Sequence, residues 1–153
     1  MSGDAVIPQG AQQDGETVRG ELRGAAGEQL FDVARKVLLG SSCAVCGATF
    51  FPQRQICPHC FDDGDISEIA LRRNGLVYAS TVVRVPSSLG HAPPYAYGYV
   101  DLPESGVRLI GRFSGGAPES FVPGTPVELD FEPVARDESG PLLAWVFRPS
   151  GGL

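Results

Sequence analysis

The four cysteines of this chain lie within one short stretch, CAVCGATFFPQRQICPHC at residues 43–60, as two Cys-x-x-Cys steps. Such an arrangement can form a disulfide framework, a redox pair or a metal site. The sequence does not open with a basic start and an apolar run, and no stretch approaches the roughly 18 apolar residues of a membrane span. We therefore expect a cytoplasmic protein without a membrane segment, in which thiols stay reduced and the paired steps bind a metal.

The spacing of the cysteines suits tetrahedral zinc. Each step presents two sulfurs from one tight knuckle, and the ten residues between the steps can form a hairpin that brings the knuckles together. The predicted ligands of one structural Zn²⁺ are Cys43, Cys46, Cys57 and Cys60. A rubredoxin-type iron centre remains the alternative, because the same four thiolates can hold either metal. Zinc with four cysteine ligands has no open coordination position, so the site is expected to hold structure and not to activate water.

Length and charge limit the remaining options. A chain of 153 residues has room for one modest domain and a small metal-stabilised module. Its net charge is −6, its pI is near 4.8, and Lys36 is its only lysine. Because nonspecific nucleic-acid binding depends on lysine and arginine neutralising phosphates, no nucleic-acid partner is expected.

The amino-terminal part is expected to be a tail followed by a helix. Residues 1–27 are rich in Gly, Gln, Ala and acids, which predicts a disordered tail. The segment 28–40, EQLFDVARKVLLG, places apolar residues at helical spacing and ends on Gly40, which predicts an amphipathic helix. Its apolar stripe can pack on its own domain or dock on a partner chain, with Leu30 and Val37 as candidate contacts.

Five short apolar runs in the second half of the chain predict β-strands, because they are rich in Val, Leu and aromatics and are separated by turn residues. The runs are 75–85, 95–102, 107–115, 126–135 and 142–149. The fourth run alternates apolar residues with Glu128, Asp130 and Glu132, which predicts a half-buried strand with a solvated acidic face. We predict a mainly β chain in which an N-terminal helix precedes a rubredoxin-like zinc ribbon at 41–68 and a five-stranded OB-fold barrel at 69–153. A sandwich is the alternative for five strands.

These segments together resemble a known family. The order of an amphipathic segment, CAVCGATFFPQRQICPHC, NGLVYASTVVRVP, PPYAYGYVDLPESGVRLIGRF, VPGTPVELDFEPV and a final FRP is similar to the zinc-ribbon/OB-fold family named domain of unknown function 35. The similarity covers about residues 28–149. It implies an acyl-CoA-associated accessory protein that forms complexes with thiolase-like enzymes, or sometimes hydratases. Such complexes act in the degradation of steroid side chains and aromatic compounds and in some polyketide-like acylations.

The chain lacks the residues for acyl transfer by itself. It has no Gly-rich phosphate loop, no Gly-x-Ser-x-Gly elbow and no cysteine outside the metal site. A thiolase-like partner is expected to catalyse a Claisen-type or retro-aldol step, in a heterotetramer with two copies of each chain. This chain is expected to stabilise the partner, form part of its acyl-CoA tunnel and exclude water. A freestanding zinc-ribbon/OB-fold nucleic-acid-binding protein is the alternative, and an independent acyl-CoA carrier is a third interpretation.

A CoA ester bound jointly with the partner requires cations for its phosphates. The candidate cations are Arg54, Arg72, Arg73 and Arg84. Phe50 and Phe51 at the ribbon tip are expected to close the ribbon against the barrel, or to face the partner and its ligand. The loop 86–95 joins the first two barrel strands, where OB folds commonly contact ligands, and carries His91. His91 is a candidate contact but not a predicted catalytic residue, because a catalytic histidine needs an orienting carboxylate.

Overall fold

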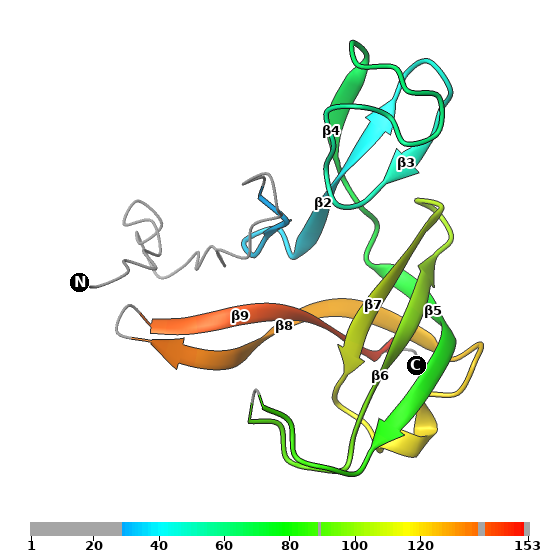
Figure 1. The fold of residues 1–153 in the computed structure, drawn as a ribbon. Helices are drawn as coiled ribbons and strands as arrows, with labels where there is room; N and C mark the ends of the chain where they lie inside the picture. Colours follow the sequence, from blue (N-terminus) through cyan, green and yellow to red (C-terminus); the bar gives the residue numbers. More distant parts are fainter. Residues whose placement is uncertain (1–28, 89, 138–139, 152–153) are drawn as a thin grey trace.

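The computed structural model describes residues 29–88, 90–137 and 140–151, and this part of the chain is mainly β-structure. The elements are β1 (Phe31–Asp32), β2 (Val37–Cys43), β3 (Thr49–Phe50), β4 (Ile66–Ala70), β5 (Asn74–Val83), β6 (Tyr95–Leu102), β7 (Val107–Phe113), η2 (Pro118–Ser120), β8 (Pro126–Asp137) and β9 (Gly140–Pro149). A small sheet of β1 to β4 adjoins a closed barrel of β5 to β9 (Figure 1). Within the described residues, no helix is long and apolar enough to cross a membrane.

The predicted amino-terminal helix is wrong for the residues that the structure describes. From Phe31 onward the segment forms β1, a four-residue turn and β2, and Phe31 pairs with Leu38 across the resulting hairpin. Asp32 holds the turn, because its carboxylate accepts a hydrogen bond from the Arg35 backbone N–H at 3.2 Å and pairs with the Arg35 guanidinium at 2.8 Å. Residues 1–28, which include the predicted tail, lie outside the described residues.

The hairpin replaces the helix because both of its arms reach the barrel core. Phe31 and Leu38 are completely buried, and Leu30 is 8% exposed. The Phe31 ring centroid lies 4.9 Å from that of Phe131 and 6.2 Å from that of Trp145, which are both barrel residues. The apolar spacing of this segment fits a helix and a short hairpin alike, so packing on the barrel decides between them.

Gly40, the expected end of the helix, lies inside β2. A Cβ atom at this position would lie 2.7 Å from the Phe50 carbonyl oxygen and 2.9 Å from a methyl group of Leu71. The glycine therefore permits a close approach of the backbone within the ribbon, as glycines inside strands often do.

The predicted five-stranded barrel is confirmed, and its strands close in the order β5-β6-β7-β9-β8. Strand β8 returns to pair with β5, and every pair is antiparallel except β7 with β9. The parallel pair is short and joins Arg112 with Val146 and Phe113 with Phe147. Closure by this pair removes the sandwich alternative, because one sheet curls on itself instead of two sheets stacking.

Alternation along the strands sets the inner and outer faces of the barrel. The inward residues of β6 are fully or almost fully buried: Ala96, Gly98, Val100 and Leu102. Tyr97 and Tyr99 point outward and are 40% and 48% exposed. Gly98 is required by the contact with β5, since a Cβ atom there would lie 2.0 Å from the Ala79 carbonyl oxygen.

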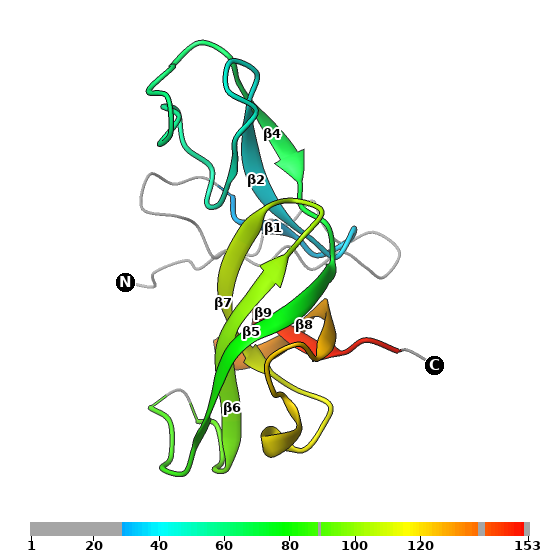
Figure 2. The same ribbon diagram turned by 90° about the vertical axis from the view of Figure 1, so that its right-hand side faces the viewer.

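One hydrophobic core joins the hairpin to the barrel. It combines residues of β1 and β2 with inward residues of all five barrel strands. Figures 1 and 2 show the same arrangement from two sides, with the base of the ribbon resting on one end of the barrel. The outer part of the ribbon has a separate and much smaller buried cluster of Cys43, Phe50 and Cys57. Such a cluster is too small to stabilise a fold alone, which indicates that a metal supplies the remaining stability.

Candidate functional site

The four predicted zinc ligands converge at the end of β2. The Sγ atoms of Cys43, Cys46, Cys57 and Cys60 all lie within 4.8 Å of one another. The sulfurs of Cys43 and Cys60 are 3.6 Å apart, as are those of Cys46 and Cys57. Zinc bonds of about 2.3 Å at tetrahedral angles separate sulfurs by about 3.8 Å, so the residues fit Zn²⁺. No disulfide competes with the metal, because all four thiols are free.

Two equivalent backbone turns shape the knuckles. The N–H of Gly47 donates to the Cys43 carbonyl at 2.8 Å, and the N–H of Phe61 donates to the Cys57 carbonyl at 3.0 Å. Both residues have positive φ, 75° at Gly47 and 64° at Phe61. The first knuckle therefore places glycine where the backbone requires a left-handed conformation, and the second places phenylalanine there.

The knuckle amides also favour thiolate formation. Burial opposes ionisation of Cys57, but the backbone N–H groups of Cys60 and His59 donate to its sulfur and lower its pKa to about 6. The His59 nitrogen lies 3.4 Å from that sulfur. At Cys60 the Asp62 amide favours the thiolate, but burial and the neighbouring sulfurs outweigh it and raise the pKa to about 12. Since a cysteine binds metal as a thiolate, metal binding at this site would release the thiol protons.

The predicted contact residues of the ribbon and the amino-terminal segment are mostly covered by the chain itself. Phe50 is 8% exposed in the ribbon cluster. The half-buried Phe51 packs edge-on against Trp145, with ring centroids 5.8 Å apart. Leu30 lies in the main core, whereas Val37 is half-buried and lines a surface cavity. Phe51 thus closes the ribbon against the barrel, which was one of the two roles expected for it.

Two of the candidate CoA cations lie together where the ribbon joins the barrel. Arg72 and Arg73 line a cavity of ≈ 460 Å³ in which Glu104 and Glu128 are also present. Arg72 pairs with Glu104 at 3.4 Å, and Arg73 pairs with Glu128 at 2.9 Å. Both guanidinium groups would have to leave these carboxylates before they bound a phosphate.

The other two candidate cations lie apart from this cavity. Arg84 follows the far end of β5 and pairs with Glu119 at 3.2 Å. Arg54 is exposed on the ribbon, and no described residue forms an ion pair with it. Its backbone N–H donates to the Ser41 hydroxyl at 3.4 Å. The four arginines therefore do not form one cluster.

His91 is half-buried, and its ring centroid lies 5.6 Å from that of Tyr95. Burial lowers its pKa, the charge of Arg112 lowers it further, and Glu132 acts in the opposite direction. A carboxylate is thus close enough to influence His91. That carboxylate accepts three side-chain hydrogen bonds from other residues, and among the described residues it forms none with His91.

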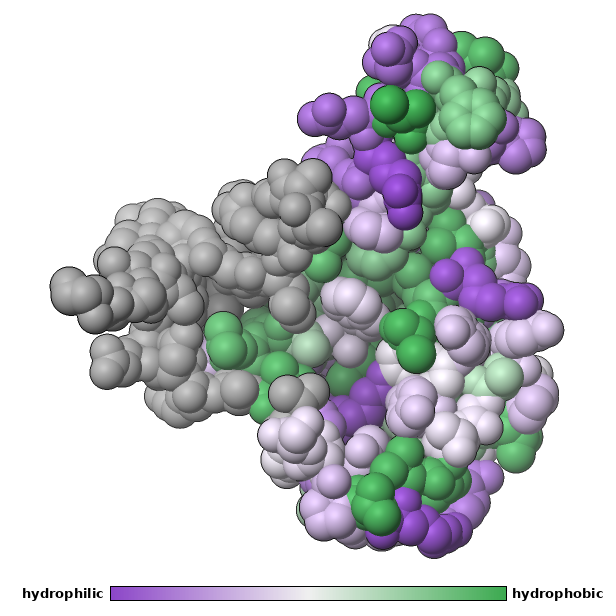
Figure 3. Space-filling model, viewed as in Figure 1, coloured by the Kyte–Doolittle hydropathy of each residue, from purple (hydrophilic) through white to green (hydrophobic). Residues whose placement is uncertain are grey.

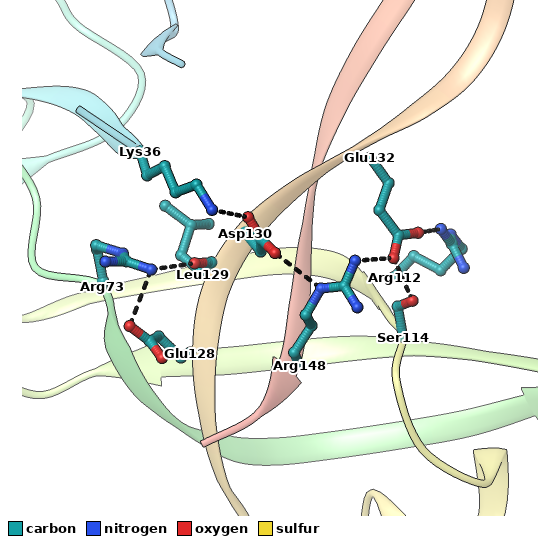
Figure 4. A network of polar contacts seen from close by, with 9 residues as sticks. All are labelled: Lys36, Arg73, Arg112, Ser114, Glu128, Leu129, Asp130, Glu132 and Arg148. Carbon is teal, nitrogen blue, oxygen red and sulfur yellow. Dashed lines mark hydrogen bonds and ion pairs between the residues drawn. The ribbon is translucent and has the colours of Figure 1, made fainter. Parts of the chain in front are cut away.

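A network of charged side chains joins three barrel strands around Glu132 (Figure 4). The carboxylate on β8 accepts hydrogen bonds from Arg112 on β7, from Ser114 just beyond β7, and from Arg148 on β9. The Arg148 contact measures 2.6 Å. These bonds lie beside the short parallel pair that closes the barrel.

The other two acids of the predicted acidic face are paired as well. Asp130 lies 3.1 Å from the Lys36 ammonium and 2.9 Å from the Arg148 guanidinium, so it connects the β1–β2 hairpin to the barrel. Glu128 pairs with Arg73. The predicted solvated acidic face is therefore wrong, because all three carboxylates are half-buried and ion-paired.

Burial opposes ionisation of the two inner carboxylates, but their partners outweigh it. At Asp130 the Phe131 amide and Lys36 bring the pKa below its ordinary value of 3.8. At Glu132 the hydrogen bonds from Ser114 and Arg112 bring the pKa below 4.5. Both groups are therefore charged at neutral pH, and the network contributes to stability only while they are ionised.

Sequence reasoning missed Arg112, Arg148 and Trp145. The alternating acids of the fourth run could have indicated that cations lie opposite them, because half-buried carboxylates require cations on neighbouring strands. The neighbours themselves were not predictable, since β7 and β9 pair only after the barrel closes.

Comparison with known proteins agrees with both parts of the fold. Residues 32–65 match the family model described as the ChsH2 rubredoxin-like zinc ribbon domain, and residues 68–132 match the ChsH2 C-terminal OB-fold domain. A DUF35 domain-containing scaffold protein of Methanocaldococcus jannaschii is 32% identical over 115 residues, which cover 74% of this chain and 81% of the relative. The benzoylsuccinyl-CoA thiolase subunit BbsA of Thauera aromatica is 34% identical over 112 residues, which cover 72% of this chain and 75% of the relative. The solved structure of an Ltp2-ChsH2(DUF35) aldolase is similar with a TM-score of 0.63 and 32% identity. The similarity covers 76% of this chain and 87% of the chain in that structure.

Proposed function

This chain belongs to the DUF35 family of ChsH2-like zinc-ribbon and OB-fold proteins, and from that membership we propose that it is an accessory subunit of a thiolase-like acyl-CoA enzyme. The observation that carries the proposal is its similarity, across most of both chains, to a protein named as a thiolase subunit. All four cysteines converge on one closed site, so the chain has no further thiol to act as a nucleophile. The groups that catalyse a Claisen-type or retro-aldol step then belong to the partner.

The contribution of this chain is to hold and shape the partner's acyl-CoA site. The shared core and the contact of Phe51 with Trp145 join ribbon and barrel, which suits a scaffold. Bound zinc would fix the two knuckles and would supply no reactive group. We propose one copy of this chain for each chain of a dimeric partner, a heterotetramer in the cytoplasm, where the thiols stay reduced. The substrate class is an acyl-CoA from lipid or aromatic-compound degradation.

Among the predicted CoA cations, we assign Arg54 to the CoA phosphates in the joint site. It is exposed, and no described residue neutralises it, whereas Arg72, Arg73 and Arg84 are ion-paired. A free guanidinium binds phosphate without first breaking an existing pair.

The test is co-expression with a thiolase-like protein from the same organism. The two proteins should co-purify, and turnover of acyl-CoA by the mixture should exceed turnover by the partner alone. Arg54→Ala should raise the KM of the complex for acyl-CoA, whereas the control Arg108→Ala, which removes an arginine paired with Asp101, should leave it unchanged. Equal turnover with and without this chain would refute the proposed function.

Nucleic-acid binding is the second candidate, favoured by the outward Tyr97 and Tyr99 on a barrel face that OB folds use for oligonucleotides. The cations near these tyrosines are already ion-paired, which opposes nucleic-acid binding. Arg108 is bound by Asp101 at 2.6 Å, and Arg112 is bound by Glu132. With a net charge of −6, the chain should not shift single-stranded DNA or RNA at low micromolar concentration in about 0.15 M salt. Submicromolar binding with a steep salt dependence would favour this candidate.

A further inference from the structure

The second zinc knuckle places a large side chain where the first places glycine. Gly47 and Phe61 each follow the last cysteine of a step, make the same backbone hydrogen bond and have positive φ. Side chains with a Cβ atom rarely adopt this conformation, and a bulky aromatic is among the least suited to it. Glycine would satisfy the turn without strain, so the fold alone does not account for phenylalanine at position 61.

The Phe61 ring is largely exposed. It is 77% exposed, the most exposed of the large hydrophobic residues that the structure describes. Two further exposed apolar side chains flank the cysteines: Val45, 59% exposed between Cys43 and Cys46, and Ile56, 54% exposed before Cys57. Each of these three residues adjoins a cysteine in the sequence, and the four cysteine sulfurs lie within 4.8 Å of one another. We call Val45, Ile56 and Phe61 the knuckle patch.

The surroundings of the knuckle patch are acidic. Asp62, Asp63 and Asp65 follow Phe61 directly, and none of them forms an ion pair with a described residue. The Asp62 carboxylate instead accepts hydrogen bonds from the backbone N–H groups of Gly64 and Asp65, at 3.2 and 2.8 Å. Figure 3 shows apolar and strongly hydrophilic side chains next to one another on the outer part of the ribbon. This end of the ribbon thus combines an apolar centre with unneutralised negative charge.

We propose that the knuckle patch docks into an apolar pocket rimmed by lysine and arginine on the thiolase-like partner, with Phe61 as the anchor. The inference rests on the proposed function and names the surface through which the chains associate. An aromatic side chain in a desolvated pocket, surrounded by complementary charge, is typical of a residue that dominates binding. A nucleic acid is a poor occupant, because the three aspartates repel phosphate.

The test compares Phe61→Gly with Phe61→Ala in complex formation with the co-expressed thiolase-like protein. Both variants remove the ring, so both should raise the dissociation constant of the complex at least about tenfold. Only glycine relieves the positive φ, so Phe61→Gly should have a Tm about 2–4 °C above that of Phe61→Ala. Bound zinc, measured by mass spectrometry, should be unchanged in both. The control is Val122→Ser, which removes a 55% exposed valine between η2 and β8, away from the ribbon, and should bind like wild type.

The outcomes separate the two proposals. If the wild type binds the partner and both Phe61 variants bind equally well, the docking surface is wrong and the accessory function stands. If the wild type binds no thiolase-like protein, the accessory function fails and the docking inference fails with it. If the isolated wild type self-associates in sedimentation and the Phe61 variants do not, the occupant is a second copy of this chain, which also overturns the inference.

Discussion

Replacing Glu132 by glutamine should destabilise the barrel more than any exposed charge replacement. This carboxylate receives hydrogen bonds from Arg112, Arg148 and Ser114, and its side chain is only 19% exposed. Glutamine keeps the shape but removes the charge, so it leaves Arg112 without a counterion and Arg148 with Asp130 alone, beside the strand pair that closes the barrel.

The magnitude follows from the number of contacts and their burial. Removing one partner of a buried ion pair costs about 3–5 kcal/mol. Glu132 is not fully buried, and glutamine can still accept one hydrogen bond, so we expect Glu132→Gln to cost about 2–4 kcal/mol of unfolding free energy. With a urea m-value of about 2 kcal/mol/M, the unfolding midpoint should fall by about 1–2 M.

The assay is urea unfolding of the zinc-loaded chain, followed by the fluorescence of its single tryptophan. Trp145 reports on the barrel, because its indole N–H donates to the Ile110 carbonyl at 2.9 Å. The matched control is Glu119→Gln, which breaks the exposed pair with Arg84 and should cost about 0–1 kcal/mol. Equal midpoint shifts for the two variants would refute the view that the Glu132 network stabilises the barrel.

Two further predictions concern the metal and pH. Protein purified without added zinc should contain about one zinc per chain by mass spectrometry, whereas Cys60→Ser should lose the metal and the amide-exchange protection of the ribbon. Metal-free wild type with a fully protected ribbon would contradict this. The unfolding free energy should fall as pH drops below about 4.5, because Asp130 and Glu132 have lower pKa values in the folded chain than the ordinary 3.8 and 4.5, so the unfolded chain takes up protons first. The unfolding free energy of Glu132→Gln should fall less steeply with pH than that of the wild type. An identical slope in the two proteins would contradict a contribution of the Glu132 carboxylate to this pH dependence.

The metal site was predictable because its geometry is local. Four sulfurs on two tight steps within residues 43–60 need only one hairpin to meet, and the structure brings them within 4.8 Å. The barrel strands were predictable for a related reason. Alternation of apolar and polar residues identifies a half-buried strand whatever its neighbours are, and all five runs became strands.

The amino-terminal segment shows where local periodicity fails. Phe31 and Leu38 lie seven residues apart, a spacing that suits two turns of a helix and also the two arms of a hairpin. The partners of Phe31, Phe131 and Trp145, lie about a hundred residues further along the chain, so no local pattern contains them.

The sequence by itself determined the metal ligands and the five barrel strands, because these depend on spacing within a few residues. Only the tertiary structure decided which cation neutralises which acid. It also decided that Phe61 occupies a position with positive φ, where glycine would be favoured. Barrel closure brings Arg112, Glu132 and Arg148 together from three strands, and the knuckle backbone imposes positive φ on whichever residue occupies position 61. The physical reason is that ion pairs and local backbone conformation depend on how distant segments are arranged in space. That arrangement exists only in the folded chain.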